Sequence, residues 1–213
     1  MTPLLRWGKA LLKLEMFRPR GSVSDRAPAP RGPVELSGNQ ALSFARDGAG
    51  LALQGAVTHE MREALKIWGA RIVPRAPRWT PDPDVFARTL GAELLEQVGE
   101  APPLIAGPAG ELAALAGAVT ALRTRWPWIR GIALVAAGEE LPDLPRSADL
   151  PFGIERVAVT RAEAAAARAR LGRELGLLAN HAGAAAASYA HELGGIALVT
   201  APGEREFSLE TSP

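Results

Sequence analysis

The sequence predicts an α/β protein with mostly parallel sheets flanked by helices. Short apolar runs alternate with helical patterns along the chain, which is typical of βα units. Cap and turn residues also stand where such helices and strands would begin and end. The 213 residues are 47% hydrophobic and 22% charged, so the chain can bury a substantial core.

The first clear βα unit lies between residues 51 and 73. Leu51 to Val57 is an apolar run expected to form a buried strand, and Thr58 is expected to cap a helix that ends near Trp68. Gly69 suits the left-handed position after this helix, and Arg71 to Val73 begins the next strand.

The same alternation continues to the C-terminal part of the chain. Thr160 and Glu163 have the spacing of a capping box, and Gly176 is placed to end that helix. The expected strands are Pro103 to Ala106, Gly131 to Ala136, Arg156 to Val159 and Ile196 to Thr200, and the expected helices are Gly110 to Arg123, Thr160 to Leu175 and Ala182 to Leu193.

Three stretches interrupt this alternation. Arg26 to Pro33 contains three prolines in eight residues, which excludes a helix and predicts an extended connector. Pro74 to Pro83 has the same character, and Gly138 to Pro151 is expected to be an irregular loop.

Charge and cysteine content exclude several classes of function. The 24 basic and 23 acidic side chains give a net charge of +1, so no nucleic acid or membrane partner is expected. The absence of cysteine excludes disulfides and thiolate catalysis, and the spacing of the histidines indicates no metal site. Charged residues interrupt the apolar N-terminus, so a cytoplasmic protein is expected.

Four regions of the chain then resemble, in order, one group of enzymes. TPLLRW with LKLEMFRPRGSVSDR is similar to an opening strand and a Gly-Ser-Val-Lys-Asp-Arg motif. VELSGNQALSFA with AVTHEMREALKIWGARIV resembles a Thr-Ser-Gly-Asn-Thr loop and the segment after it. PPLIAGPAGELAAL stands at a Gly-Thr-Gly-Gly-Thr phosphate loop, and GLLANHAGAAAASYAHELGGIALVTAPGERE resembles a Ser-Ser-Gly-Ala helix and the end that follows. The chain resembles a shortened member of the pyridoxal phosphate (PLP)-dependent cysteine synthase group.

This resemblance implies a reduced form of the type II PLP-enzyme, or tryptophan synthase β-like, architecture with two lobes. Residues 17–77 would form the smaller lobe, and residues 1–16 and 78–213 the larger one. Members of the group are usually homodimers, so self-association or pairing with an active relative is expected.

The resemblance also places Ser24 at the position of the lysine that forms an imine with PLP. A hydroxyl cannot form this imine, and the neighbouring Arg20 and Arg26 stay protonated. No catalytic residue is therefore expected in the motif.

The segment at the phosphate loop also departs from the enzyme pattern in ways that disfavour binding of the cofactor. Gly107 and Gly110 remain as residual cofactor contacts, but Pro108 removes an N–H and both threonine hydroxyls are missing. Glu111 would place a carboxylate where the phosphate sits, and we expect it to interact with the helix dipole. A glutamate in a first helical turn is also a common stabilising choice with no bearing on ligands.

Other positions keep parts of the pattern. Ser37, Gly38, Asn39 and Gln40 match the loop that would hold a substrate carboxylate, with Asn39 beside the cofactor ring oxygen. His181 begins the segment that replaces Ser-Ser-Gly, as a substitute ring partner or as a capping or surface histidine.

A basic and aromatic cluster between a helix and a strand has two possible interpretations. It could stack on nucleic acid or a partner protein, or form a solvated corner with its Trp rings packed inward, which we favour. It comprises Arg123, Arg125, Trp126, Trp128 and Arg130.

The sequence thus favours a catalytically inactive, cysteine synthase-like protein that serves as a binding or regulatory subunit, without PLP and with a possible amino acid or small carboxylate ligand. The alternative is a PLP-dependent lyase or transferase that acts on an O-activated serine and holds its cofactor non-covalently. A decayed gene product is the third possibility.

Overall fold

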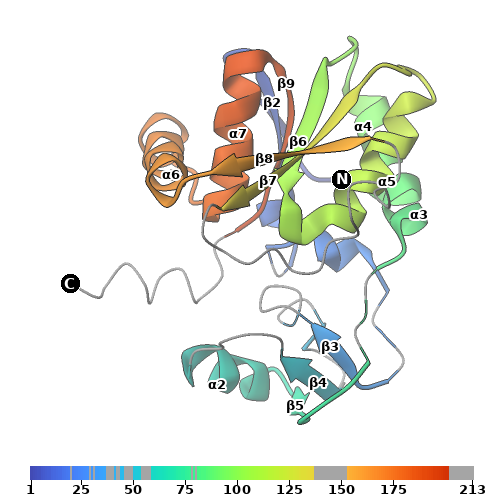
Figure 1. Ribbon diagram of the computed structural model, residues 1–213, viewed down its shortest axis with the longest axis vertical. Coiled ribbons are helices and arrows are strands. Elements are labelled where there is room, and N and C mark those ends of the chain that lie inside the picture. The colour runs from blue at the N-terminus through green and yellow to red at the C-terminus, as the bar shows by residue number, and fades with distance from the viewer. Residues whose placement is uncertain are drawn as a thin grey trace.

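The computed structural model describes residues 1–19, 21–28, 30, 32–36, 41, 44–45, 50–53, 59–77, 79, 81–136 and 153–201. Within them the chain forms a six-stranded sheet and a three-stranded sheet (Figure 1). The predicted α/β class with mostly parallel sheets flanked by helices is confirmed.

The larger sheet has the strand order β1-β2-β9-β6-β7-β8, and only β1 runs antiparallel to its neighbour. Strand β2 comes from the N-terminal hairpin, yet it pairs in parallel with β9 near the other end of the chain, from Ala10 beside Gly195 to Leu14 beside Val199. The strands are β1 (Leu4–Trp7), β2 (Ala10–Leu14), β6 (Leu104–Pro108), β7 (Arg130–Ala136), β8 (Ile154–Val159) and β9 (Gly195–Val199).

Helices cover both faces of this sheet, as Figure 1 shows. On one face α7 (His181–Leu193) packs on β9 and β6, and α6 (Arg161–Leu175) packs on α7. On the other face α5 (Leu112–Arg123) packs against a helical run made of α3 (Pro83–Phe86), the π-helical η4 (Ala87–Gly91) and α4 (Ala92–Gln97). Each face has its own buried apolar cluster.

The smaller sheet has the parallel order β3-β4-β5, with β3 (Val34–Leu36), β4 (Gly50–Leu53) and β5 (Arg71–Ile72), and is accompanied by α2 (His59–Ile67). Leu51 of β4 and Leu65 of α2 are buried and belong to the same apolar cluster as Phe86 and Leu90 of the α3–η4 run. One hydrophobic core therefore joins the two sheets. The proposed lobe boundaries at residues 17 and 77 remain a prediction.

Several local predictions are confirmed and others need correction. Thr160 and Glu163 form the capping box of α6, and Gly176 ends it with a φ of 68°. The cap of α7 is Asn180, whose Oδ1 accepts from the N–H of Gly183 at 2.6 Å, and not His181. The expected cap Thr58 lies outside the described residues.

The tryptophans of the basic and aromatic cluster do not both pack inward. Trp126 is buried, with Arg125 stacked over its ring, but 66% of Trp128 is exposed. Trp128 follows the turn after α5, before the backbone enters β7 at Arg130. No helix in the described part of the chain has both the length and the apolar character required to cross a membrane.

Candidate ligand site at Ser24 and Glu111

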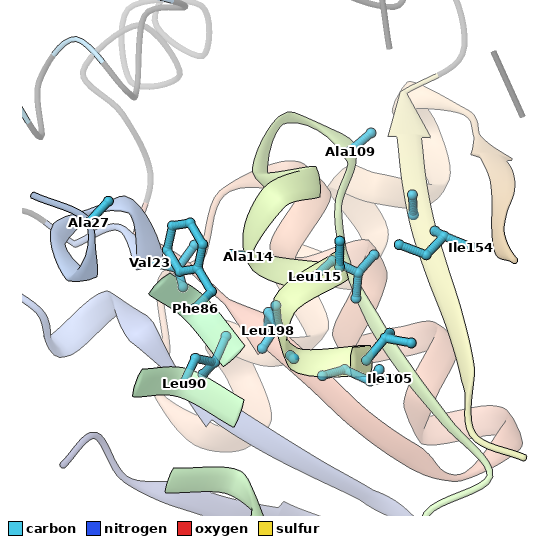
Figure 2. Close-up of a cluster of buried hydrophobic side chains, with 14 of the residues drawn as sticks. Val23, Ala27, Phe86, Leu90, Ile105, Ala109, Ala114, Leu115, Ile154 and Leu198 are labelled. Carbon is cyan, nitrogen blue, oxygen red and sulfur yellow. The ribbon is translucent and has the colours of Figure 1, made fainter. Parts of the chain in front are cut away.

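Ser24 lies in a short 3-10 turn, η2 (Val23–Arg26), and is fully buried. Ser22 caps the turn, since its Oγ accepts a hydrogen bond of 3.1 Å from the backbone N–H of Ser24. Val23 and Ala27 belong to the apolar cluster that also contains Phe86 of α3 and Leu198 of β9 (Figure 2). Core packing on both sides therefore fixes the position of Ser24.

The segment that the resemblance matches to the phosphate loop is a glycine-containing turn where β6 ends, at the carboxyl edge of the larger sheet. It comprises the end of β6 and the 3-10 turn η5 (Ala109–Glu111), after which α5 begins. Gly107 lies within β6, where an added Cβ would be 3.2 Å from Leu198 of the neighbouring strand, so this glycine serves the packing of the sheet. A Cβ at Gly110 would meet nothing within 4 Å. Packing therefore explains Gly107, whereas the space beside Gly110 is open.

The two segments meet through the side chain of Glu111. Oε1 of Glu111 accepts a hydrogen bond of 2.8 Å from the Ser22 hydroxyl, and Oε2 accepts one of 2.9 Å from the Ser24 hydroxyl. Glu111 is the N-cap residue of α5, but its side chain makes no capping hydrogen bond. We expected Glu111 to interact with the dipole of this helix. The hydrogen bonds of its carboxylate are instead to the two serines.

The environment of Glu111 favours the protonated acid. Burial raises the pKa of this carboxyl to about 7, the two serine hydrogen bonds oppose the rise, and the charges of Asp25 and Glu15 add to it. Near neutral pH the site therefore holds at most one negative charge of its own, next to other acidic side chains.

A buried ionic network, which the sequence analysis did not anticipate, holds the far end of η2. Arg26 donates to Glu15 at 2.7 and 2.8 Å and to Glu93 at 2.9 Å. Lys13 is fully buried and donates to Glu93, to Gln97 at 2.6 Å and to the carbonyl of Thr2 at 2.7 Å. Two cations and two carboxylates thus tie η2 to β2, η1 (Glu15–Phe17) and α4.

The pKa directions of Glu93 and Arg26 favour their charged forms, whereas that of Lys13 disfavours it. Burial tends to raise the pKa of Glu93, but hydrogen bonds from Arg26 and Lys13 outweigh it and lower the pKa to about 2. Burial lowers the pKa of Lys13, opposed by Glu93. Burial also works against the charge of Arg26, but its bonds to Glu15 outweigh that and raise its pKa.

The other predicted site residues are placed as follows. Ser37, Gly38, Asn39 and Gln40 lie outside the described residues, so their roles remain predictions. His181 is the first residue of α7, beside the buried Asn180, whose side chain donates to the Thr200 hydroxyl at 2.6 Å. The structure therefore brings Ser24 together with the turn at Gly107 and Gly110 through Glu111.

Comparison with known proteins gives a consistent picture of the architecture. No family profile and no curated protein match this sequence. Among solved structures, an O-acetylserine-dependent cystathionine beta-synthase from Helicobacter pylori superposes with a TM-score of 0.79 at 15% identity, over 97% of this chain and 94% of that one. O-ureido-L-serine synthase superposes with a TM-score of 0.73 at 19% identity, over 97% and 90%. A hydrogen sulfide-producing enzyme from Fusobacterium nucleatum gives 0.70 at 15%, over 96% and 94%. The chain has the fold of the type II PLP enzymes. The fold expected from the sequence resemblance is confirmed.

The type II fold implies PLP, which needs an amine for the imine and a cradle for the phosphate. None of the three lysines offers that amine. Lys13 is engaged in the ionic network, Lys66 pairs with Glu63 on the exposed side of α2, and Lys9 lies against Gly194 at the opposite edge of the sheet. The Glu111 carboxylate accepts a hydrogen bond from Ser24, which the sequence resemblance places at the motif lysine. The residues at this position do not fit covalently attached PLP.

Proposed function

We propose that this protein is a catalytically inactive relative of the cysteine synthase-type PLP enzymes that acts as a binding or regulatory subunit and uses no PLP. The observation that carries the proposal is the pair of hydrogen bonds from Ser22 and Ser24 to Glu111. These hydrogen bonds connect the position of the motif lysine directly to the phosphate turn. The polar groups at both places are therefore already paired with each other within the protein.

Electrostatics support the exclusion of a phosphate from this position. Two unit charges about 4 Å apart repel by about 4 kcal/mol at an effective dielectric constant of about 20. Above about pH 7, where Glu111 loses its proton, a phosphate dianion beside it would meet this repulsion, and Asp25 and Glu15 act in the same direction on the site. An enzyme that held PLP here would have to overcome it without the attachment that lysine provides.

The ligand that we propose for this subunit is an amino acid or small carboxylate, bound at Ser37, Gly38, Asn39 and Gln40. Support comes from a structural neighbour. A variant of O-ureido-L-serine synthase with one lysine replaced by alanine, solved with O-ureido-L-serine bound, superposes with a TM-score of 0.75 at 20% identity, over 97% of this chain and 89% of that one. A protein of this fold can therefore hold an amino acid after loss of a lysine.

The second candidate is a PLP-dependent lyase or transferase that acts on an O-activated serine with non-covalently held cofactor. Two structural neighbours favour it, since one is an O-acetylserine-dependent enzyme and another is an O-ureido-L-serine synthase. It requires PLP to displace or bypass the contacts of Glu111.

Mixing the purified protein with PLP separates the two candidates. We expect no imine absorption band and no heat of binding in calorimetry, whereas saturable uptake of PLP would overturn the first proposal. Titration with amino acids then tests the ligand, because a compound bound only by the folded state adds about 2.7 kcal/mol of stability at a hundredfold excess over its Kd. Absence of any thermal shift with all amino acids would contradict the ligand assignment.

The partner we propose for this subunit is a second copy of the chain or an active relative with the same fold. Size-exclusion chromatography with light scattering of the purified protein tests self-association. A monomer at all concentrations would leave the heteromer as the form to be tested, by co-purification with an active enzyme of this fold.

A further inference from the structure

Glu111 is a buried acid whose hydrogen bonds are not those of a helix cap. It stands at the N-cap position of α5, a helix of 12 residues, yet its carboxylate makes no capping contact with the backbone. Both oxygens instead accept from hydroxyls that come from residues more than 80 positions earlier in the chain. The side chain thus behaves as a bound anion would, held by donors from a separate segment.

The donors around this carboxylate form a convergent set. The hydroxyls of Ser22 and Ser24 both point at it, and the 3-10 turn η2 fixes their spacing because Ser22 also accepts from the Ser24 amide. The ionic network at Arg26 and the apolar contacts of Val23 hold η2 on either side of Ser24. We therefore expect these donors to stay in place when the carboxylate is removed.

We propose that the Glu111 carboxyl is a built-in occupant of an anion position, formed by the Ser22 and Ser24 hydroxyls beside the start of α5. The occupied position rejects phosphate esters in the native protein. Removal of the carboxylate opens it to a phosphate-type anion. The inference rests on the proposed function, in which the chain holds no PLP, and it identifies the group that takes the place of the cofactor's phosphate.

The test measures binding of inorganic phosphate at pH 8 by calorimetry and by thermal shift. Glu111→Ala removes the carboxylate and leaves both serines. Glu111→Gln is the matched control, since it removes the charge but keeps a side chain of the same size in the position. A triple variant, with Ser22→Ala and Ser24→Ala added to Glu111→Ala, removes the donors.

We expect Glu111→Ala to bind phosphate at least tenfold more tightly than the native protein, the glutamine variant and the triple variant. Equal phosphate binding by Glu111→Ala and by the triple variant would overturn the inference, as would no binding by a folded Glu111→Ala protein. If the alanine variant does not fold, Glu111→Ser is tested in the same way, and failure of phosphate to stabilise it counts against the inference.

The outcome is distinguishable from failure of the proposed function. Uptake of PLP by the native protein with an imine band overturns the proposed function itself. A native protein that takes up no PLP, together with an alanine variant that ignores phosphate, leaves the proposed function standing and removes only the role of Glu111 as an internal occupant.

Discussion

The Ser24 hydroxyl donates a hydrogen bond of 2.9 Å to Oε2 of Glu111. In the resemblance to cysteine synthases these two positions belong to separate motifs, one for the imine and one for the phosphate. In this protein they are direct partners. A change at one of them therefore alters the environment of the other, and the two are expected to act as a unit.

Ser24→Lys is expected not to restore cofactor chemistry. The new ammonium would lie beside the Glu111 carboxylate, which favours the protonated amine, while imine formation needs the neutral amine. Absorbance between 300 and 500 nm after addition of PLP should match that of the control Ser24→Ala. A saturable imine band in the lysine variant alone would contradict this prediction.

Glu111 is expected to make stability fall as the pH rises. A carboxyl with a pKa of about 7 in the folded protein and about 4.5 when unfolded keeps its proton longer in the folded state, so its contribution is lost between about pH 4.5 and pH 7. The shift corresponds to about 3 kcal/mol. Urea unfolding of the native protein and of Glu111→Gln at pH 5 and pH 8 checks this.

The glutamine variant should lose most of that pH dependence in the free energy of unfolding. Glu93, with its lowered pKa, affects stability only below about pH 4.5 and does not interfere with this window. An equal change from pH 5 to pH 8 in both proteins would show that Glu111 is not the titrating group.

Arg26→Ala is expected to destabilise the protein by about 3–5 kcal/mol, because it leaves Glu15 and Glu93 buried without their main cation. Arg18 is the matched control. It faces the same two carboxylates at 3.5 and 3.9 Å, but its side chain is 25% exposed against 3% for Arg26, so Arg18→Ala should cost about 1 kcal/mol or less. Similar losses from both variants, measured by urea unfolding, would refute a central role of Arg26.

Gly117→Ala and Gly110→Ala should differ sharply. A Cβ at Gly117 would lie 2.2 Å from the carbonyl oxygen of Pro83 and 2.7 Å from the amide of Ala87, so α5 and the α3–η4 run would have to separate. We expect a loss of about 1–3 kcal/mol despite the better helix propensity of alanine.

At Gly110 a Cβ meets nothing within 4 Å, and we expect the free energy of unfolding to change by about 0.5 kcal/mol or less. Thermal and urea unfolding of the two variants give the comparison. Strong destabilisation by Gly110→Ala would indicate that this glycine has a backbone role that its surroundings do not explain.

Much of the fold could be predicted from local signals. The alternation of apolar runs and helices located β6, β7, β8 and β9 to within a few residues, and the Thr160 to Gly176 caps gave the bounds of α6. The helical run from Pro83 to Gln97 was missed, although Asp82 before Pro83 is a cap followed by proline at a first helical position. The neighbouring prolines masked that signal.

The site was less accessible to sequence reasoning because its contacts join distant segments. Motif comparison identified Ser24 and Glu111 as departures from the enzyme pattern, but no local pattern indicates that their side chains meet. The ionic network likewise joins residues up to about 80 positions apart in the sequence, namely Lys13, Glu15, Arg26 and Glu93. Each of them is of a charged residue type that usually lies on the surface, so none of them alone indicates burial.

The pairing of β2 with β9 has a consequence during synthesis. Strand β9 separates β2 from β6 in the larger sheet, so a nascent chain that has emerged only as far as α7 still lacks the strand that must lie between them. Until β9 leaves the ribosome, the N-terminal hairpin keeps an open edge that can pair with other chains. Completion of the larger sheet therefore waits for β9, and chaperone demand should be greatest just before this strand appears.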